Sequence, residues 1–290
     1  MAIKESELLI NKDGSIYHIN LKPEDIADTI ILVGDQDRVE MVSSFFSSIE
    51  LKKHKREFYT VTGTFNNKRI TVMSTGIGTD NIDIVINELD ALVNIDLNAR
   101  EIKADKKSLN LIRIGTSGGL QADLTPGSYV VSKSSVGFDG MLNFYKNIVD
   151  ITDTDFETEF TKHTHWNSRL STPYLVDASE KLTNKLVGEK YHHGITISSN
   201  GFYGPQGRIL RLDTADNSLN DKIHTFSYKG RKITNYEMES SALSGLAKML
   251  GHEATTVCLI IANRVTKNAV SDYHPLMKEL VLDVLNKVTA

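Results

Sequence analysis

The sequence predicts an α/β fold in which helices cover both faces of a mainly parallel or mixed β-sheet. Apolar, strand-like runs alternate along the chain with segments of helical periodicity, which is the pattern of such folds. Three of the runs, residues 28–33, 69–74 and 109–114, each end at a turn that contains glycine. No repeat, low-complexity linker or domain boundary interrupts the pattern, so residues 1–290 are expected to form a single domain.

The other expected elements follow from apolar spacing and from helix-ending glycines. Further strands are expected at 129–131, 194–198, 232–235 and 254–261. One helix follows the second turn, with Ile82, Ile86, Leu89 and Val93 on one face. Another begins near Glu239 and is closed by a glycine at 251. A last helix spans about 274–288, and the polar stretch 95–109 is expected to be a surface insertion.

Composition argues against several function classes. The 290 residues carry a net charge of −4, whereas duplex-binding proteins present a basic face, so no nucleic-acid partner is expected. No run of about 18 apolar residues predicts a membrane span, and the first residues are unlike a secretory signal. The single cysteine, Cys258, excludes an intrachain disulfide and fits a reducing cytoplasm. His163, His165 and the pair 192–193 lack acidic or cysteine partners at ligand spacing, so no metal is expected.

Two carboxylates flank a methionine where the strand 232–235 gives way to a helix. Buried acids are costly unless they are paired, so Glu237 and Glu239 need a ligand or a cation at this junction. Ligands of α/β sheets bind at the carboxyl ends of the strands. Met238 offers an apolar floor and the acids offer acceptors for hydroxyls, which suits a sugar; a helix start that favours negative charge explains the acids equally well.

The glycine turns and one further loop supply the rest of a candidate site. Arg38 and Arg113 adjoin two of the turns, where main-chain N–H groups and guanidinium donors can bind a phosphate. Neither turn has the ending of a nucleotide P-loop. In the loop 198–208, Phe202 and Tyr203 provide a stacking face, and Gln206 offers a donor and an acceptor to the imide edge of uracil. Arg208 can stabilise a departing anionic base.

Together these segments resemble the nucleoside phosphorylase superfamily, and within it the uridine phosphorylases. The resemblance runs from about residue 17 to residue 264 and rests on five motifs in the family's order: 34–38, 74–78, 113–116, 202–208 and 237–239. Asn263 and Arg264 stand where purine-cleaving relatives place an aspartate. The resemblance implies a sheet in the form of a distorted barrel flanked by helices. It also implies a pentosyltransferase of pyrimidine salvage that cleaves uridine, with deoxyuridine and thymidine left open as further substrates, and uses inorganic phosphate as co-substrate.

The resemblance also assigns a role to each matching residue. Catalysis is expected from Arg113, Glu239, Gln206 and Arg208. Phosphate would be bound by Gly34, Arg38, Arg56, Arg113 and Thr116; ribose by His18, Glu237, Met238 and Glu239; the base by Phe202, Gln206, Arg208 and Arg264. His18 and Arg56 would reach into the site of a neighbouring subunit, which makes a homodimer the minimal active unit and leaves a hexamer open.

Two departures from the family pattern bear on these roles. Gln36 replaces a proline that sets turn geometry, and this change is expected to be tolerated. The segment 79–81 replaces Gly-Pro-Ser, and this change can alter the start of the helix and its phosphate contacts. It can also alter a site for a monovalent cation, such as potassium, that some relatives form near Glu57, Ile77 and position 81. A purine phosphorylase, a nucleosidase that uses water, and a non-catalytic nucleoside-binding relative remain alternatives; the three phosphate-reading arginines argue against the nucleosidase.

Overall fold

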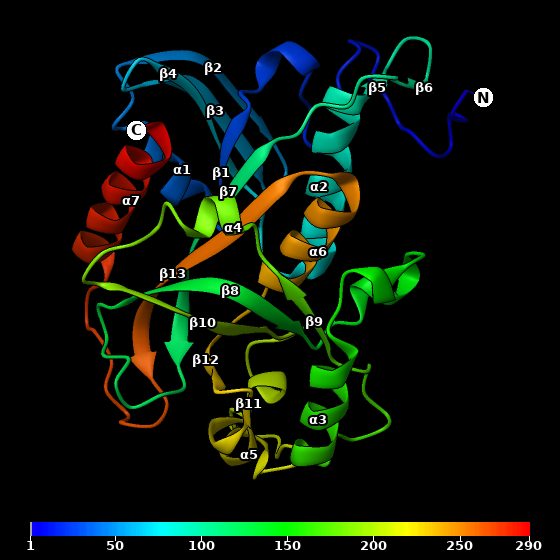
Figure 1. Cartoon of the computed structure of the whole chain (residues 1–290). Helices are drawn as coiled ribbons and strands as arrows, with labels where there is room; N and C mark the ends of the chain where they lie inside the picture. The colour runs from blue at the N-terminus through cyan, green and yellow to red at the C-terminus, as the bar shows by residue number, and fades with distance from the viewer. Residues whose placement is uncertain (1) are drawn as a thin grey trace.

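A mixed β-sheet forms the centre of the molecule (Figure 1). The structure is a computed structural model and describes residues 2–290. Ten strands are hydrogen-bonded in the order β11-β12-β10-β8-β13-β7-β1-β4-β3-β2, and an eleventh, β9, pairs with β8. Their bounds are β1 Thr29–Val33, β2 Ser48–Lys55, β3 Phe58–Phe65, β4 Lys68–Ser74, β7 Asn110–Gly119, β8 Tyr129–Gly137, β9 Tyr174–Asp177, β10 Tyr191–Ser198, β11 Ser227–Tyr228, β12 Arg231–Glu237 and β13 Glu253–Asn263.

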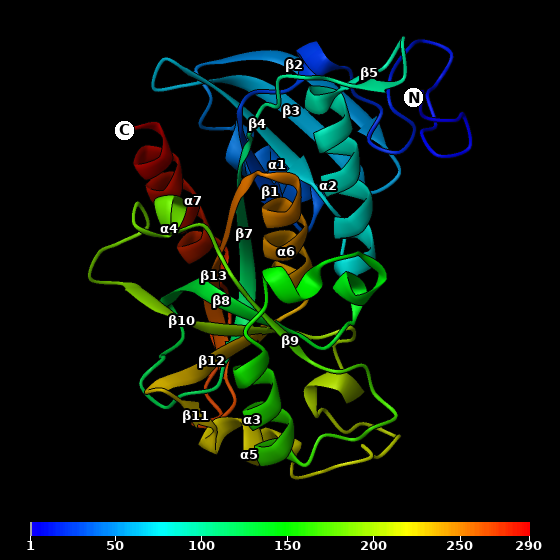
Figure 2. The same ribbon diagram turned by 45° about the vertical axis from the view of Figure 1, so that its right-hand side comes forward.

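Helices lie on both faces of this sheet, as Figures 1 and 2 show from two directions. None of the helices in the described part of the chain is long and apolar enough to cross a membrane. The helices are α1 Gln36–Ser43, α2 Thr79–Asn94, α3 Thr154–Thr164, α4 Glu180–Thr183, α5 Leu219–Thr225, α6 Ser240–Leu250 and α7 His274–Thr289, with 3-10 turns η1 Pro23–Asp25, η2 Met141–Phe144, η3 Ile148–Asp150 and η4 Gly204–Gln206.

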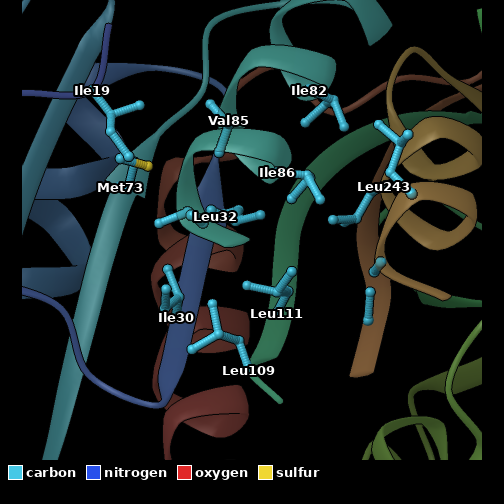
Figure 3. Packing of buried hydrophobic residues seen from close by; sticks show 14 of the residues in the cluster. Ile19, Ile30, Leu32, Met73, Ile82, Val85, Ile86, Leu109, Leu111 and Leu243 are labelled. Carbon is cyan, nitrogen blue, oxygen red and sulfur yellow. The ribbon is translucent and has the colours of Figure 1, made fainter. Parts of the chain in front are cut away.

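The two-residue period of strand β1 explains how the helical layers attach. Ile30 and Leu32 pack in a cluster with α2 and α6, as the close view of Figure 3 shows. Ile31 and Val33 point to the opposite face and pack with α1 and α7. All four side chains are fully buried, and each contributes about 1.5–3 kcal/mol by leaving water. Because both faces of β1 are buried, its residues form a continuous apolar run in the sequence.

Parallel pairing places several strand ends at one edge of the sheet. β1 runs parallel to β4 and β7, and β13 runs parallel to β7. β12 runs parallel to β10 and also pairs antiparallel with the end of β7, through Asn235↔Gly119 and Tyr236↔Gly118. That last pairing closes a circuit through β7, β13, β8, β10 and β12. It brings the end of β12 against the end of β7, two segments far apart in the sequence.

The α/β class and the elements expected from the sequence are confirmed, with differences in detail. The strands beginning near 28, 69 and 109 are β1, β4 and β7, and Gly251 ends α6 in the left-handed conformation at φ 82°. The stretch 95–109 contains an isolated pair, β5 Ile95–Asp96 with β6 Glu101–Ile102, outside the main sheet. Strands β2 and β3 and helix α3 were not expected from the sequence.

Candidate active site

The ends of β1, β7 and β12 surround a cavity of about 410 Å³. It lies at the edge where ligands of α/β sheets bind. It is lined by most of the residues that the sequence predicted for the site: Gly34, Arg38, Arg113, Thr116, Phe202, Gln206, Arg208, Glu237, Met238 and Glu239. Further lining residues that the sequence did not single out are Asp35, Ser117, Gly118, Tyr236, Ile261 and Ala262. Most of these adjoin a predicted motif; Ile261 and Ala262 carry no chemical signal and follow only from the register of β13.

Arg113 forms the buried end of the cavity. Its side chain, on β7, is 6% exposed and forms an ion pair with Glu239 through Nη2. Nε and Nη1 have no hydrogen-bond partner in the part of the chain described, although Nη1 lies 3.5 Å from Glu237 Oε2. Buried donors without partners are costly. These two therefore suit an anion that enters the cavity and accepts from both, as a phosphate does.

Glycines make room for this guanidinium. A Cβ at Gly115 would lie 2.2 Å from Nη1 of Arg113, which is closer than atoms can approach. A Cβ at Gly34 would lie 3.8 Å from Nη2. The glycine at 115 is therefore required by the path of the arginine across the sheet.

Arg38 lies at the same end, on the first turn of α1. Its Nη2 is 2.9 Å from Asp35 Oδ2, and the Asp35 side chain also accepts from the Arg38 N–H at 2.8 Å. Asp35 thus starts the helix and orients the arginine. Gln36, in place of the family's proline, donates from Nε2 to the carbonyl oxygen of Arg56 at 2.9 Å, which ties this turn to the hairpin of β2 and β3.

Glu237 and Glu239 have different environments. Glu237 accepts from the N–H groups of Glu239 at 2.9 Å and Ser240 at 3.0 Å, and from the hydroxyls of Ser198 at 2.6 Å and Ser240 at 2.7 Å. Both of its oxygens are occupied by groups at the start of α6. From the end of β12, the side chain of this predicted ribose ligand thus caps the N–H groups at the start of α6.

Glu239 has fewer partners and a perturbed pKa. It accepts from the N–H of Gly78 at 2.7 Å and pairs with Arg113. Burial raises the pKa of the Glu239 carboxyl to about 7; Arg113 opposes this rise and Glu237 adds to it. Burial alone would lower the pKa of Arg113, but the two carboxylates raise it above its ordinary value. A carboxylate poised in this way, beside a cavity, is typical of functional sites.

The opposite end of the cavity carries donors. Gln206 Oε1 accepts from Arg208 Nη1 at 2.7 Å and from Arg264 Nη2 at 2.7 Å, so both of its lone pairs are used. The amide NH₂ of Gln206 is left as a donor. Arg208 also stacks on Phe202 at 3.6 Å from the ring centroid, so one face of this predicted base-stacking ring is covered. Burial and the neighbouring Arg264 lower the pKa of Arg208 to about 10.

Three predicted residues do not line the cavity. Arg264 lies behind Gln206, also donates to the Gln206 carbonyl at 2.9 Å, and orients that residue. His18 is bonded to Glu88 through Nδ1 at 2.6 Å. Arg56 is exposed, and its guanidinium lies 5.8 Å from the ring of Tyr17, the residue before His18. His18 and Arg56 therefore share one outer surface of the subunit.

The segment 79–81 starts α2 in spite of its departure from the family pattern. Gly78, at φ 98°, precedes the helix, and its N–H reaches Glu239. Asn81 Nδ2 donates to the carbonyl oxygen of Ile77 at 3.3 Å, an oxygen that the expected cation site would use. Residues 2–290 contain no group of three or more His, Cys, Asp or Glu side chains that could hold a metal ion.

Known proteins are similar to this chain in sequence and in fold. A family model described as the phosphorylase superfamily matches residues 28–289. The chain belongs to the phosphorylase superfamily. It is 32% identical to a uridine phosphorylase of Thermococcus kodakarensis over 88% of this chain and 80% of that protein. It is 30% identical to the Escherichia coli uridine phosphorylase over 87% of each.

Similarity to solved structures extends over the whole fold. A Trypanosoma brucei nucleoside phosphorylase, described as showing uridine phosphorylase activity, is similar at a TM-score of 0.86 and 28% identity, over 98% of this chain and 100% of that one. A purine nucleoside phosphorylase of Listeria welshimeri is 25% identical to this chain, over 84% of this chain and 85% of that protein. Family membership therefore leaves the base to be decided by the site. At Asn263, where purine-cleaving relatives were expected to differ, the side chain donates to the carbonyls of Gln121 at 2.7 Å and Leu124 at 2.8 Å.

Proposed function

We propose that this protein is a pentosyltransferase that cleaves uridine with inorganic phosphate, giving uracil and ribose 1-phosphate. The T. kodakarensis and E. coli relatives are uridine phosphorylases, and the T. brucei structure is described as showing that activity. Deoxyuridine and thymidine are further substrates that the same base contacts accept. The cavity supports this assignment through the opposite chemistry of its two ends.

The base end carries the proposal. Gln206 presents its amide NH₂ because two arginines hold its oxygen, and Arg208 lies beside it. Uracil departs as an anion whose charge lies largely on carbonyl oxygens, and these oxygens need donors. A purine leaving group needs a proton at N7 and therefore an acid. The acids that line the cavity lie outside the loop that carries Gln206 and Arg208: Asp35 precedes α1, Glu237 ends β12 and Glu239 precedes α6. The donor-rich base end thus favours a pyrimidine.

The ribose and phosphate roles follow from charge. Cleavage of the bond between C1′ and N1 develops positive charge on ribose and negative charge on uracil. Phosphate on Arg113, Arg38 and the nearby Gly34 and Thr116 would stabilise the sugar cation and attack C1′. Met238 would support the apolar face of the sugar, and ionised Glu239 would accept from a ribose hydroxyl. Each preorganised donor of this kind commonly supplies about 3–4 kcal/mol of transition-state stabilisation.

We also propose that each active site needs two subunits. The cavity's three arginines are balanced by its three acids, Asp35, Glu237 and Glu239. A phosphate dianion therefore benefits from one more cation. Arg56 and His18 share an outer surface and would supply this charge and a ribose contact to a neighbouring subunit in a homodimer or in a larger ring such as a hexamer.

The co-substrate, a candidate potassium site and the cellular compartment each rest on one observation. Inorganic phosphate serves as co-substrate, and no organic cofactor is required for this reaction. Asn81 holds the Ile77 carbonyl, so a potassium ion near Glu57 and Ile77 would need Asn81 to turn away. A cytoplasmic location is supported by the single, buried Cys258, which suits a reducing compartment.

A substrate panel tests the base assignment. Uridine, thymidine and inosine would each be incubated with phosphate, and release of the free base would be followed. We expect uridine to be cleaved far faster than inosine. In Gln206→Ala, uridine cleavage should fall steeply, because a site built to hydrogen-bond a polar edge discriminates by up to about 10⁴. Equal or faster cleavage of inosine by the unmodified enzyme would refute the pyrimidine assignment.

A further inference from the structure

A second cavity lies on the other side of the turn that carries Gln206. Its volume is about 320 Å³, within the usual range of small-molecule sites, which begins at about 300 Å³. Gln206 lines the first cavity, whereas Gly204, Pro205 and Gly207 of the same turn line the second. The turn η4 and its flanking glycine thus form a partition with one cavity on each side. The helices α3 and α5 lie close to this region in the lower part of Figure 2.

The wall opposite the partition is aromatic and apolar. Trp166 packs against buried Phe138, with the ring centroids 4.6 Å apart. The indole N–H donates to the carbonyl oxygen of Ser171 at 3.0 Å, so the ring that lines the cavity is held in place and its one donor is already used. Leu170 and Leu219 also line the cavity, and Leu170 is 50% exposed. A planar ring is the ligand group that such a wall accommodates best.

The polar rim of the cavity is acidic. Asp213 and Asp216 both line it, and His165 is the basic side chain that faces them. Asp216 is already paired with Lys222 at 2.7 Å and accepts from Ser218 at 2.6 Å. Asp213 is exposed, and within residues 2–290 it makes no hydrogen bond or ion pair. An unpaired carboxylate beside an aromatic wall favours a ligand that carries a ring and a positive charge.

We propose that this second cavity binds a small aromatic amine, with its ring against Trp166 and its ammonium group at Asp213. The ligand would be distinct from nucleoside and phosphate, because those substrates bring carbonyl and phosphate oxygens that an acidic rim repels. Bound there, the amine contacts the main chain of Pro205 and Gly207 and thereby the turn that positions Gln206.

Hydrogen bonds connect the two sides of the partition. Asn220 donates to the Gln206 carbonyl at 3.1 Å and accepts from the hydroxyl of Tyr236, which lines the first cavity, at 3.1 Å. A Cβ on Gly207 would lie 2.3 Å from Asn220 Nδ2, so the turn packs tightly on this asparagine. The amine should therefore alter the KM of the nucleoside and leave that of phosphate unchanged. This coupling, unlike the binding itself, rests on the proposed function of Gln206.

Fluorescence provides a direct test of binding, because Trp166 is the only tryptophan in the chain. The full-length protein would be titrated with 2-phenylethylamine, whose ring does not absorb at the red edge of the indole band. Its matched control is 3-phenylpropanoate, which has a similar ring and linker and the opposite charge. The proposal expects a saturable change in emission with the amine and none with the acid. An equal response to both compounds, or none to the amine, would overturn it.

Charge reversal at Asp213, on the rim of the cavity, provides a second test of amine binding. Asp213→Lys should weaken amine binding about three- to ten-fold, because a favourable exposed ion pair becomes a repulsive one. Asp105→Lys makes the same change at an exposed aspartate outside the cavity and should leave the affinity unchanged. Equal affinity for both variants would place the amine elsewhere.

Kinetics separate the site from its coupling. At saturating amine, the nucleoside KM should change by about five-fold, a typical allosteric coupling. The effect should disappear in Asp213→Lys at the same amine concentration. Saturable binding without any change in nucleoside KM would refute the coupling between the cavities but not the existence of the amine site. Failure of the proposed function itself would appear separately, as no uridine cleavage in the absence of amine.

Discussion

At the scale of single residues, the proposed phosphate site depends on the path of the Arg113 side chain past Gly115. A methyl group at 115 would lie 2.2 Å from Nη1 and must displace the guanidinium. Gly115→Ala should therefore lower kcat/KM for phosphate by about ten- to a hundred-fold, the scale of an ångström misplacement. Gly204→Ala is the matched control, because a Cβ there meets nothing within 4 Å. An unchanged phosphate KM in Gly115→Ala would remove Arg113 from the site.

Glu239 should make the proposed reaction dependent on pH. Its carboxyl, with a pKa raised to about 7 by burial, stabilises the developing positive charge on ribose only when it is ionised. Protonation as the pH falls through 7 removes this negative charge, so kcat/KM for uridine should decrease about ten-fold per pH unit below that point. Glu239→Gln has no group to titrate there and should lose this limb of the profile while remaining slow. The measurement is a pH profile of initial rates for both enzymes.

Most of the residues that the sequence singled out line one cavity, but their hydrogen-bond partners did not follow from residue type. Gln206 was expected to offer both a donor and an acceptor to uracil, but Arg208 and Arg264 occupy its oxygen. Glu237 was expected at the ribose, and its oxygens are bonded to the start of α6. A sequence does not show such partners, because they come from strands and loops distant along the chain.

At the scale of elements, the junction of β12 and α6 places the acids on either side of Met238 in different surroundings, which predicts a stabilising role for Glu237 and a catalytic role for Glu239. Glu237→Ala should leave the N–H groups of Glu239 and Ser240 without their acceptor and lower the free energy of unfolding by about 1–3 kcal/mol. Glu239→Ala should instead act mainly on kcat. Urea unfolding and steady-state kinetics on both variants distinguish the roles. If Glu237→Ala is as stable as the parent enzyme but inactive, Glu237 is a ligand rather than a cap.

Whether an element could be predicted from the sequence depends on how its residues are buried. β1, β4 and β7 were predicted because burial on both faces makes them apolar runs, and α2 because it buries one regular stripe. β2 was missed because its edge position leaves most of its residues exposed and polar. The closing contact of β12 with β7 has no signature in the sequence, since Asn235 and Gly119 are brought together only by the path of the chain.

At the scale of the whole molecule, the location of His18 and Arg56 outside their own subunit's cavity predicts shared active sites. Arg56→Ala alters the donating side, and Glu239→Ala alters the receiving side. Mixed and allowed to exchange subunits, the two inactive variants should recover roughly a quarter of parental activity, because about half of the dimers are mixed and each has one intact site in two. Proven exchange without recovery would mean that both residues serve the same subunit.

In the proposed reaction, phosphate bound at Arg113 attacks the sugar. Phosphorus NMR of a reaction with uridine and inorganic phosphate tests this attack, since it identifies the sugar product and counts the phosphate consumed. We expect one ribose 1-phosphate formed, and one inorganic phosphate lost, for every uracil released. Uracil released at the same rate without phosphate, with free ribose as the product, would contradict it and make the protein a hydrolase.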